Sequence, residues 1–79
     1  MPDYGALVRY MVENMVSRPD QVDVEEERDG HRVTVRVKTA PEDLGKLIGR
    51  GGRHIEAIRL VTRAASLRPR DRVLVEVRD

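Results

Sequence analysis

The sequence contains no cysteine, no tryptophan and no phenylalanine, and it has two tyrosines, Tyr4 and Tyr10. Without cysteine the chain has neither disulfides nor thiolate metal ligands, so an apolar core alone must hold it together. A reducing compartment suits such a chain. The scarcity of aromatic side chains also argues against base stacking on exposed Phe, Tyr or Trp as a main mode of binding.

Long apolar runs are absent as well, since no stretch approaches the roughly 20 apolar residues that a membrane helix needs. The first ten residues, MPDYGALVRY, lack the charged-then-apolar layout of a secretory signal. We therefore expect a cytoplasmic protein without membrane contact. The 79 residues suit one small domain, residues 1–79, and leave no room for a deep enclosed active site, a small-molecule substrate or a cofactor.

The net charge of +1 hides a strong polarisation along the chain. Residues 1–30 carry three arginines and eight acidic residues, whereas residues 31–79 carry 12 lysines or arginines and six acidic residues. A basic half favours a polyanionic partner, because Lys and Arg that neutralise phosphates release condensed counterions. A solvated surface of mixed charge is the plainer alternative, and charge alone does not decide between the two.

Hydrophobic periodicity predicts one helix and then two strands in the first half of the chain. Residues 3–17 place apolar side chains on one face at helical spacing, with Asp3 as the N-cap and Pro19 as the stop. Residues 22–28 and 31–38 alternate apolar and polar side chains, as half-buried strands do.

The dipeptide Asp29-Gly30 between the two strands favours a type I′ hairpin turn. If these two residues are the whole loop, apolar pairs meet on one face and opposite charges on the other. The expected pairs are Arg28 with His31, Val24 with Val35, Val22 with Val37, Glu27 with Arg32, and Asp23 with Arg36. Glu25 and Glu27 are then cross-strand partners of a basic strand and not a metal site.

Two further helices and a last strand are predicted after the hairpin. The stretch TAPEDLGKLIG opens a short helix, in which Thr39 and Glu42 have the spacing of a capping box. A longer helix covers residues 52–67, and residues 72–77 alternate again as a strand. The side chains of the long helix that we expect to face inward are Ile55, Ile58, Val61, Ala64 and Ala65.

The predicted order is therefore α-β-β-α-α-β. Three strands with one apolar face need a cover, and three amphipathic helices supply it. We expect a two-layer α+β fold with a three-stranded sheet covered by three helices. The pattern leaves open whether the last strand joins the sheet in a parallel or an antiparallel direction.

The stretch IGRGGRHI, residues 48–55, separates the short helix from the long one. Gly49 suits the end of the first helix, where a positive φ is common. The following turn exposes the first N–H groups of the long helix, which carry the positive end of its dipole. A phosphate backbone can approach the main chain there, because no β-carbons stand in the way and Arg50 and Arg53 supply counter-charges. The three glycines of this loop are Gly49, Gly51 and Gly52.

Two nucleotide-binding glycine motifs do not fit this loop. A dinucleotide-binding G-x-G-x-x-G needs a glycine at position 54, where the chain has His54, and no Lys-Ser or Lys-Thr follows for a P-loop. In a purely structural role the glycines only let two helices pack at a sharp angle, which does not account for the flanking arginines.

The polar residues give no sign of catalysis. The chain has two histidines: His31 lies at the hairpin and His54 in the first turn of the long helix, and no paired nucleophile and base are apparent. We expect no enzymatic activity, with His54 either solvated or a supplementary contact of the loop.

The stretch LIGRGGRHI resembles the KH-domain signature, in which an apolar pair precedes G-x-x-G and an apolar residue follows three positions on. The element order looks like the prokaryotic, type II KH arrangement. The strings APEDLGKLIGRGGRHIEAIR and SRPDQVDV, together with the chain length, are similar to the small bacterial single-KH-domain RNA-binding proteins of the KhpA (YlqC) type. The resemblance covers essentially the whole chain.

The resemblance implies a module that holds about four nucleotides of single-stranded RNA. By analogy the G-x-x-G loop grips the sugar-phosphate backbone, and the bases lie in an apolar groove beside it. The implied backbone contacts are Gly49, Arg50, Gly51, Gly52, Arg53 and Lys46, with Lys38 as a further candidate. The implied groove residues are Leu44, Ile48, Ile55, Val37 and Ile58, although groove and core compete for such side chains.

The resemblance also implies roles and partners. An RNA chaperone or post-transcriptional regulator that affects cell shape or division is one expectation. A homodimer, or a heterodimer with a larger Jag-like KH protein, is another, because weak binding by one domain gains avidity from a second site. In the alternative interpretation the protein is mainly an adaptor in such an assembly and RNA binding is secondary. Intact glycines with flanking arginines favour RNA binding.

Overall fold

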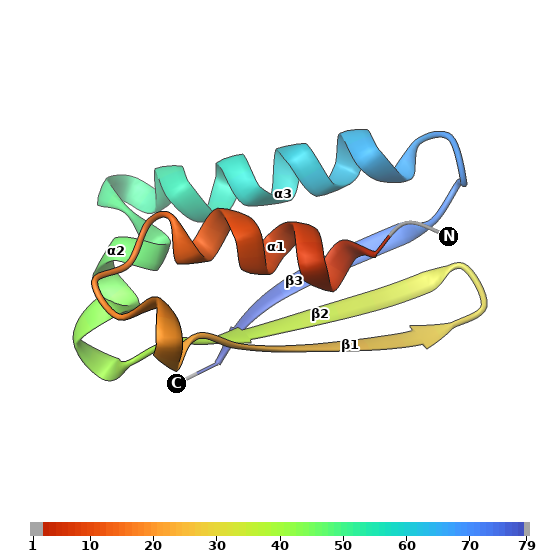
Figure 1. Cartoon of the computed structure of the whole chain (residues 1–79). Helices are drawn as coiled ribbons and strands as arrows, with labels where there is room; N and C mark the ends of the chain where they lie inside the picture. Colours follow the sequence, from red (N-terminus) through yellow and green to blue (C-terminus); the bar gives the residue numbers. More distant parts are fainter. Residues whose placement is uncertain (1–2, 79) are drawn as a thin grey trace.

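The computed structural model describes residues 3–78 and has the two-layer α+β architecture that the sequence predicts (Figure 1). The order α-β-β-α-α-β is confirmed. In chain order the main elements are α1 (Tyr4–Glu13), β1 (Asp23–Asp29), β2 (Arg32–Lys38), α2 (Leu44–Ile48), α3 (Arg53–Ser66) and β3 (Arg72–Arg78). Short 3-10 turns lie at Pro19–Gln21, Pro41–Asp43 and Arg50–Gly52.

Strand β2 is the centre of the sheet, antiparallel to β1 and parallel to β3. The direction of the last strand, which the pattern left open, is thus parallel. A parallel neighbour needs a long crossover, and here the crossover from β2 to β3 contains α2 and α3. Figure 1 shows α1 and α3 side by side over one face of the sheet, and no helix of residues 3–78 covers the other face.

The core lies between the helices and the covered face of the sheet. Side chains from α1, α2, α3, β2 and β3 meet there. Burial of each large aliphatic one contributes about 1.5–3 kcal/mol relative to exposure. The residues with no exposed surface include Tyr4, Val8, Val12, Val33, Val35, Val37, Leu47 and Ile58. Three of these come from β2, as expected for the middle strand of the sheet.

The hairpin register differs by two residues from the predicted one. Asp29 pairs with Arg32, so the loop is Gly30-His31 instead of Asp29-Gly30. Gly30 is the residue of this loop with a positive φ, 63°. A type II′ turn requires a positive φ at its first central position, which Gly30 occupies. A shift of two keeps every side chain on its predicted face but changes its partner. The observed pairs are Val24 with Val37, Glu25 with Arg36, Glu27 with Thr34, and Asp23 with Lys38.

Helix α1 begins as predicted but ends earlier. The Asp3 carboxylate accepts a hydrogen bond from the Ala6 N–H at 2.9 Å, which confirms the N-cap. The helix ends at Glu13 and not near residue 17. The N–H groups that would continue the helix, those of Ser17 and Arg18, bind the Asp43 carboxylate instead.

The predicted capping box before α2 is absent. The Thr39 hydroxyl donates to the Ala40 carbonyl at 3.1 Å, and no side chain caps the turn that follows. The box needs a free hydroxyl at the N-cap, and the N-cap of this turn is Ala40. The short helix therefore depends on its packing and on Asp43.

The buried face of α3 is rotated from the predicted one. Ile55 and Ile58 face inward as expected, but Thr62 and Ser66 complete the buried face. Their hydroxyls donate to carbonyls three residues earlier, so these polar groups are satisfied inside the helix. The three residues predicted inward that are exposed are Val61, Ala64 and Ala65.

A buried carboxylate joins three elements at the hairpin end of the sheet. The Asp71 side chain is 2% exposed and accepts hydrogen bonds from the Tyr4 hydroxyl at 2.7 Å and from both Arg28 terminal nitrogens at 3.1 and 3.2 Å. His31 Nδ1 lies 3.1 Å from the same carboxylate. The start of β3 is thereby tied to α1 and to the β1–β2 hairpin.

These contacts shift the pKa values of the cluster in opposite directions. The hydrogen bonds from Arg28 and Tyr4 hold the pKa of Asp71 well below its usual range, because they stabilise the charged form. Burial, with the hydrogen bond to Asp71, raises the pKa of Tyr4 to about 12. The cluster is therefore charged at Asp71 and neutral at Tyr4 near neutral pH.

We predict that Asp71→Asn lowers the free energy of unfolding at about pH 7. In acid, the free energy of unfolding of this variant should depend less on pH than that of wild type. Because folding lowers the pKa of Asp71, its stabilising effect is full above the unfolded value of about 4 and is lost as the pH falls below it. Urea unfolding at several pH values from about 7 to 2 measures this. Glu76→Gln is the control, since the Glu76 side chain is 45% exposed and lies 4.0 Å from Arg36, so that the loss of its charge should change the free energy of unfolding by less than about 0.5 kcal/mol. An acid dependence equal in wild type and Asp71→Asn would contradict the assignment.

Candidate nucleic-acid interface

The chain reverses direction at Gly49, between α2 and the turn that leads into α3. Gly49 has φ 78° and ψ 166°, which residues with a β-carbon rarely adopt. A β-carbon at this position would lie 2.7 Å from Cγ of His54 and 2.9 Å from the His54 backbone nitrogen. Glycine is required here by both conformation and space, and the predicted end of the short helix at Gly49 is confirmed.

The side chain of His54 links the two helices around this reversal. Its Nδ1 lies 2.6 Å from the carbonyl oxygen of Lys46 in α2. Because a carbonyl only accepts, Nδ1 carries the proton and donates it. His54, expected to be solvated or a loop contact, therefore also positions the start of α3 against α2.

The remaining two glycines leave the surface of the loop open. Gly51 and Gly52 have φ values of 65° and 79°, and no heavy atom lies within 4 Å of a β-carbon built on Gly51. No side chain caps the start of α3, which is 14 residues long. The Arg53 N–H donates to the Arg50 carbonyl in the turn before the helix. The start of α3 carries the positive end of the helix dipole. The loop is thus accessible to an anion at the main chain.

The basic side chains around the loop differ in the ion pairs and hydrogen bonds that they make within the protein. Among residues 3–78, Arg50 and Arg53 make no ion pair with any carboxylate, and both are exposed. Lys46 instead donates to the Ser17 hydroxyl and lies 4.0 Å from the Asp43 carboxylate. The two arginines are available to a ligand, whereas Lys46, whose side chain is 54% exposed, also has contacts within the protein.

Asp43 is a structural residue of the site that sequence reasoning missed. Its side chain is 1% exposed and accepts hydrogen bonds from the N–H groups of Ser17 at 3.2 Å and Arg18 at 3.0 Å. Burial alone would raise the pKa of Asp43, but these two donors and Lys46 outweigh burial and lower it. In the sequence Asp43 looks like an ordinary acid at a helix start, and only the fold brings the two N–H groups to it.

Five apolar residues were candidates for a base-binding groove, and the structure places them differently. Leu44 is half-buried, and Ile48 is 36% exposed. These two residues are four apart on α2, so they lie on one face of the helix about 6 Å apart along its axis. Ile55 retains 7% exposure beside the loop. Val37 and Ile58 have no exposed surface and belong to the core, so they offer nothing to a base.

A shallow hollow of about 400 Å³ runs from the loop along α3. Gly51 and Arg53 border it at the loop end, and Arg63 lies further along the helix. Arg59, which also lines the hollow, donates to the Val75 carbonyl at the sheet edge at 3.1 Å. All the lining residues of the hollow come from the loop and α3.

Other kinds of site lack support in the described part of the chain. Between residues 3 and 78, no group of three or more His, Asp or Glu side chains is arranged to hold a metal ion. None of the helices in that range has the length and hydropathy to cross a bilayer. His31 faces Asp71, but its ring is 78% exposed and no nucleophile accompanies the pair.

Comparison with known proteins matches almost the entire chain. Residues 5–77 match the family model described as KhpA/KhpB, KH domain. A protein named RNA-binding protein KhpA from Caldanaerobacter subterraneus subsp. tengcongensis is 41% identical over 73 residues, which cover 92% of this chain and 97% of the relative. A protein of the same name from Clostridium acetobutylicum is 39% identical over 71 residues, which cover 90% of this chain and 95% of the relative. The one from Halalkalibacterium halodurans is 37% identical over 73 residues, covering 92% and 96%. No solved structure gave a significant match.

The match and the geometry agree. The range 5–77 includes all three strands down to Val77, and the Gly49–Gly52 loop lies inside it. The relatives share more than a third of their residues with this chain over nearly their whole length. The chain therefore belongs to the KhpA/KhpB KH-domain family.

Proposed function

We propose that the protein binds single-stranded RNA as one KH unit, with the Gly49–Gly52 loop and the start of α3 on the phosphate backbone. One observation carries this proposal. The loop has no β-carbon at three of its four positions and leads into a helix without a side-chain cap. It contains Arg50 and is followed by Arg53, and neither pairs with a carboxylate among residues 3–78. The relatives are named RNA-binding proteins, which supports RNA as the nucleic acid.

Different parts of the site contact different groups of the RNA. Loop and first-turn N–H groups of α3 donate to phosphate oxygens, and Arg50 and Arg53 neutralise the neighbouring charges. Bases lie against the exposed parts of Leu44, Ile48 and Ile55. Lys46 contributes by fixing α2 to the α1–β1 linker, because its ammonium group is held by Ser17 and Asp43.

Binding of this kind is weak and tolerant of sequence. If about three phosphates are bound, a plot of the logarithm of the association constant against the logarithm of the salt concentration has a slope of about −2. The groove has no aromatic residue for stacking, since both tyrosines lie in α1. These properties suit a cytoplasmic RNA chaperone or post-transcriptional regulator, without catalysis and without a cofactor.

We predict that Arg50→Asp with Gly51→Asp weakens RNA binding at least about tenfold, because two carboxylates then face the phosphates. Fluorescence anisotropy with a short mixed-sequence RNA at two salt concentrations measures this, and circular dichroism confirms folding. Space for the new side chains exists at Gly51.

The matched control is Arg50→Asn with Gly51→Asn, which has the same side-chain sizes and the same backbone strain without the negative charges. We expect it to bind between wild type and the double aspartate. If the two double variants bind RNA equally well, charge at the loop is irrelevant and the loop does not hold phosphate.

Self-association is a second candidate function, and the exposed side of α3 favours it. Leu60 is 64% exposed, Val61 42% and Leu67 72%, and the exposed Ala57 and Ala64 complete an apolar stripe along the helix. A contiguous exposed apolar surface is often an interaction site. A second copy of the chain, or a larger KH protein of the same family, then supplies the second RNA site that raises avidity.

We predict that Leu60→Lys lowers self-association, raising the dimer dissociation constant at least about tenfold through loss of a buried leucine. Sedimentation equilibrium over a range of concentrations measures the constant. Leu74→Lys is the control, because Leu74 is 54% exposed but lies on the sheet and not on α3. A monomeric wild type, or equal effects of both substitutions, would exclude the α3 stripe as the interface.

A further inference from the structure

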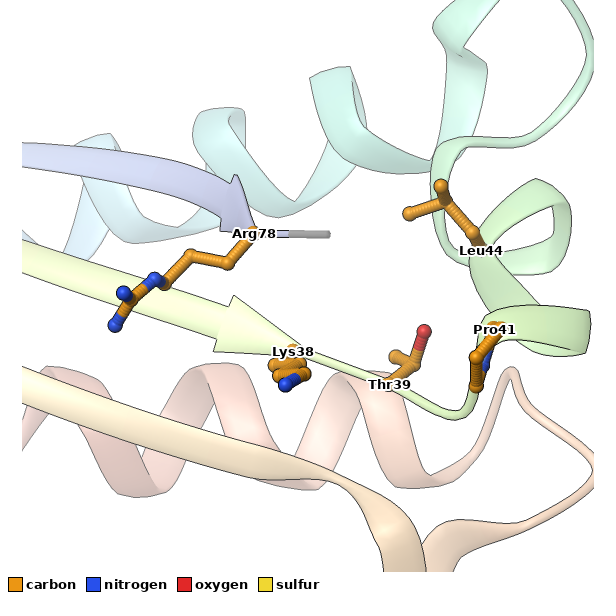
Figure 2. A pocket seen from close by; sticks show the side chains of 5 residues that line it. All are labelled: Lys38, Thr39, Pro41, Leu44 and Arg78. Atoms are coloured by element: carbon orange, nitrogen blue, oxygen red, sulfur yellow. The ribbon is translucent and has the colours of Figure 1, made fainter.

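A small pocket lies where the ends of β2 and β3 meet the start of α2. It has a volume of about 160 Å³ and is lined mainly by apolar atoms. The lining residues are Lys38, Thr39, Pro41, Leu44 and Arg78. Figure 2 shows Pro41 and Leu44 on the α2 side and Lys38 and Arg78 at the strand ends. Ligand pockets for whole small molecules usually exceed about 300 Å³, so this pocket suits one small planar group.

Two cations at the rim of the pocket are neighbours on adjacent strands. Lys38 of β2 and Arg78 of β3 are direct partners in the parallel register, and both are exposed. Like charges opposite one another destabilise a sheet. Asp23 faces Lys38 from β1, but no ion pair joins them. An anion at the pocket rim would relieve this repulsion.

The position of Arg78 is compatible with such a role. In Figure 2 its side chain extends back along the sheet, away from Pro41 and Leu44. Its guanidinium lies 3.5 Å from the Glu25 carboxylate. Both side chains of that pair are more than half exposed. Exposed ion pairs contribute little to stability, so Arg78 can exchange Glu25 for a phosphate at little cost.

The pocket continues the face of α2 that the proposed groove uses. Leu44 lines the pocket, and Ile48 lies on the same helix face one turn closer to the Gly49–Gly52 loop. A strand held by its phosphates at the loop, with bases along Ile48 and Leu44, therefore arrives at this pocket. Lys38 and Arg78 then stand beyond Leu44, where the next phosphate of the same strand passes.

We propose that this pocket is an additional nucleotide subsite. It takes the base of the nucleotide next to the roughly four that the loop and groove hold, and Lys38 and Arg78 bind its phosphate. The inference rests on the proposed function, because the occupant is the same RNA strand. It extends the footprint from the helices onto the ends of the sheet strands.

The test compares a tetranucleotide with a hexanucleotide RNA of uniform sequence, in anisotropy titrations at low salt. Wild type should bind the hexanucleotide more tightly than the tetranucleotide. The difference should exceed what the extra positions for a four-nucleotide site on the longer strand explain. Lys38→Gln with Arg78→Gln should weaken hexanucleotide binding about tenfold and leave tetranucleotide binding within about twofold. The salt slope for the hexanucleotide should become shallower by about 0.7 for the lost phosphate.

The control is Arg32→Gln with Arg72→Gln. These two arginines are also direct partners on β2 and β3, so the same charge is removed from the same strands at the other end of the sheet. They should leave hexanucleotide binding within about twofold of wild type. An equal loss in both double variants would show general electrostatic attraction and overturn the subsite.

Failure of the subsite and failure of the proposed function give different results. If wild type binds both RNAs and the Lys38 and Arg78 variant matches it on both, the subsite is wrong and the loop proposal stands. A variant that weakens tetranucleotide and hexanucleotide binding equally also overturns the subsite, because the pocket is then not specific to the added nucleotides. If wild type binds neither RNA, the proposed function itself fails, and the subsite fails with it.

Discussion

The reversal of the chain at Gly49 is the constraint on which the rest of the site depends. It places the start of α3 beside the end of α2, and only glycine fits, because a β-carbon would collide with His54. The His54 ring in turn donates to the α2 carbonyl of Lys46, which fixes the angle between the two helices. The positive end of the α3 dipole and the apolar face of α2 consequently border the same surface. The phosphate and base contacts that we propose require this adjacency.

Two buried carboxylates hold the framework around this reversal at opposite ends of the fold. Asp43 binds the linker after α1 to the start of α2, next to the loop. Asp71 binds α1 and the hairpin to the start of β3 at the far end of the sheet. A chain of this size has a small core and no disulfide, so buried charge-assisted hydrogen bonds have a large share in fixing its elements. Among residues 3–78, the loop arginines Arg50 and Arg53 pair with no carboxylate and remain available to a ligand.

Periodicity and turn residues were sufficient for the element order, the two layers and the end of the short helix at Gly49. These features depend on local pattern, which a sequence displays directly. The hairpin register and the buried face of α3 were wrong because each depends on partners distant in sequence. Arg28 and His31 both reach Asp71 across the fold. Thr62 lies in the core in place of Val61 because of how α3 packs on the sheet, and its hydroxyl is satisfied within its own helix. Only the packing shows that Val37 belongs to the core and not to the groove. Only the packing shows that the Lys46 ammonium group has partners within the protein.

The central claim is that RNA phosphates lie at the Gly49–Gly52 loop, and amide chemical shifts of ¹⁵N-labelled protein titrated with a short single-stranded RNA test it most directly. The account predicts the largest changes at Arg50, Gly51 and Arg53, smaller ones along α2, and almost none around Asp71 at the opposite end of the sheet. Changes centred on the hairpin end or on the uncovered face of the sheet, with the loop amides unmoved, would contradict it.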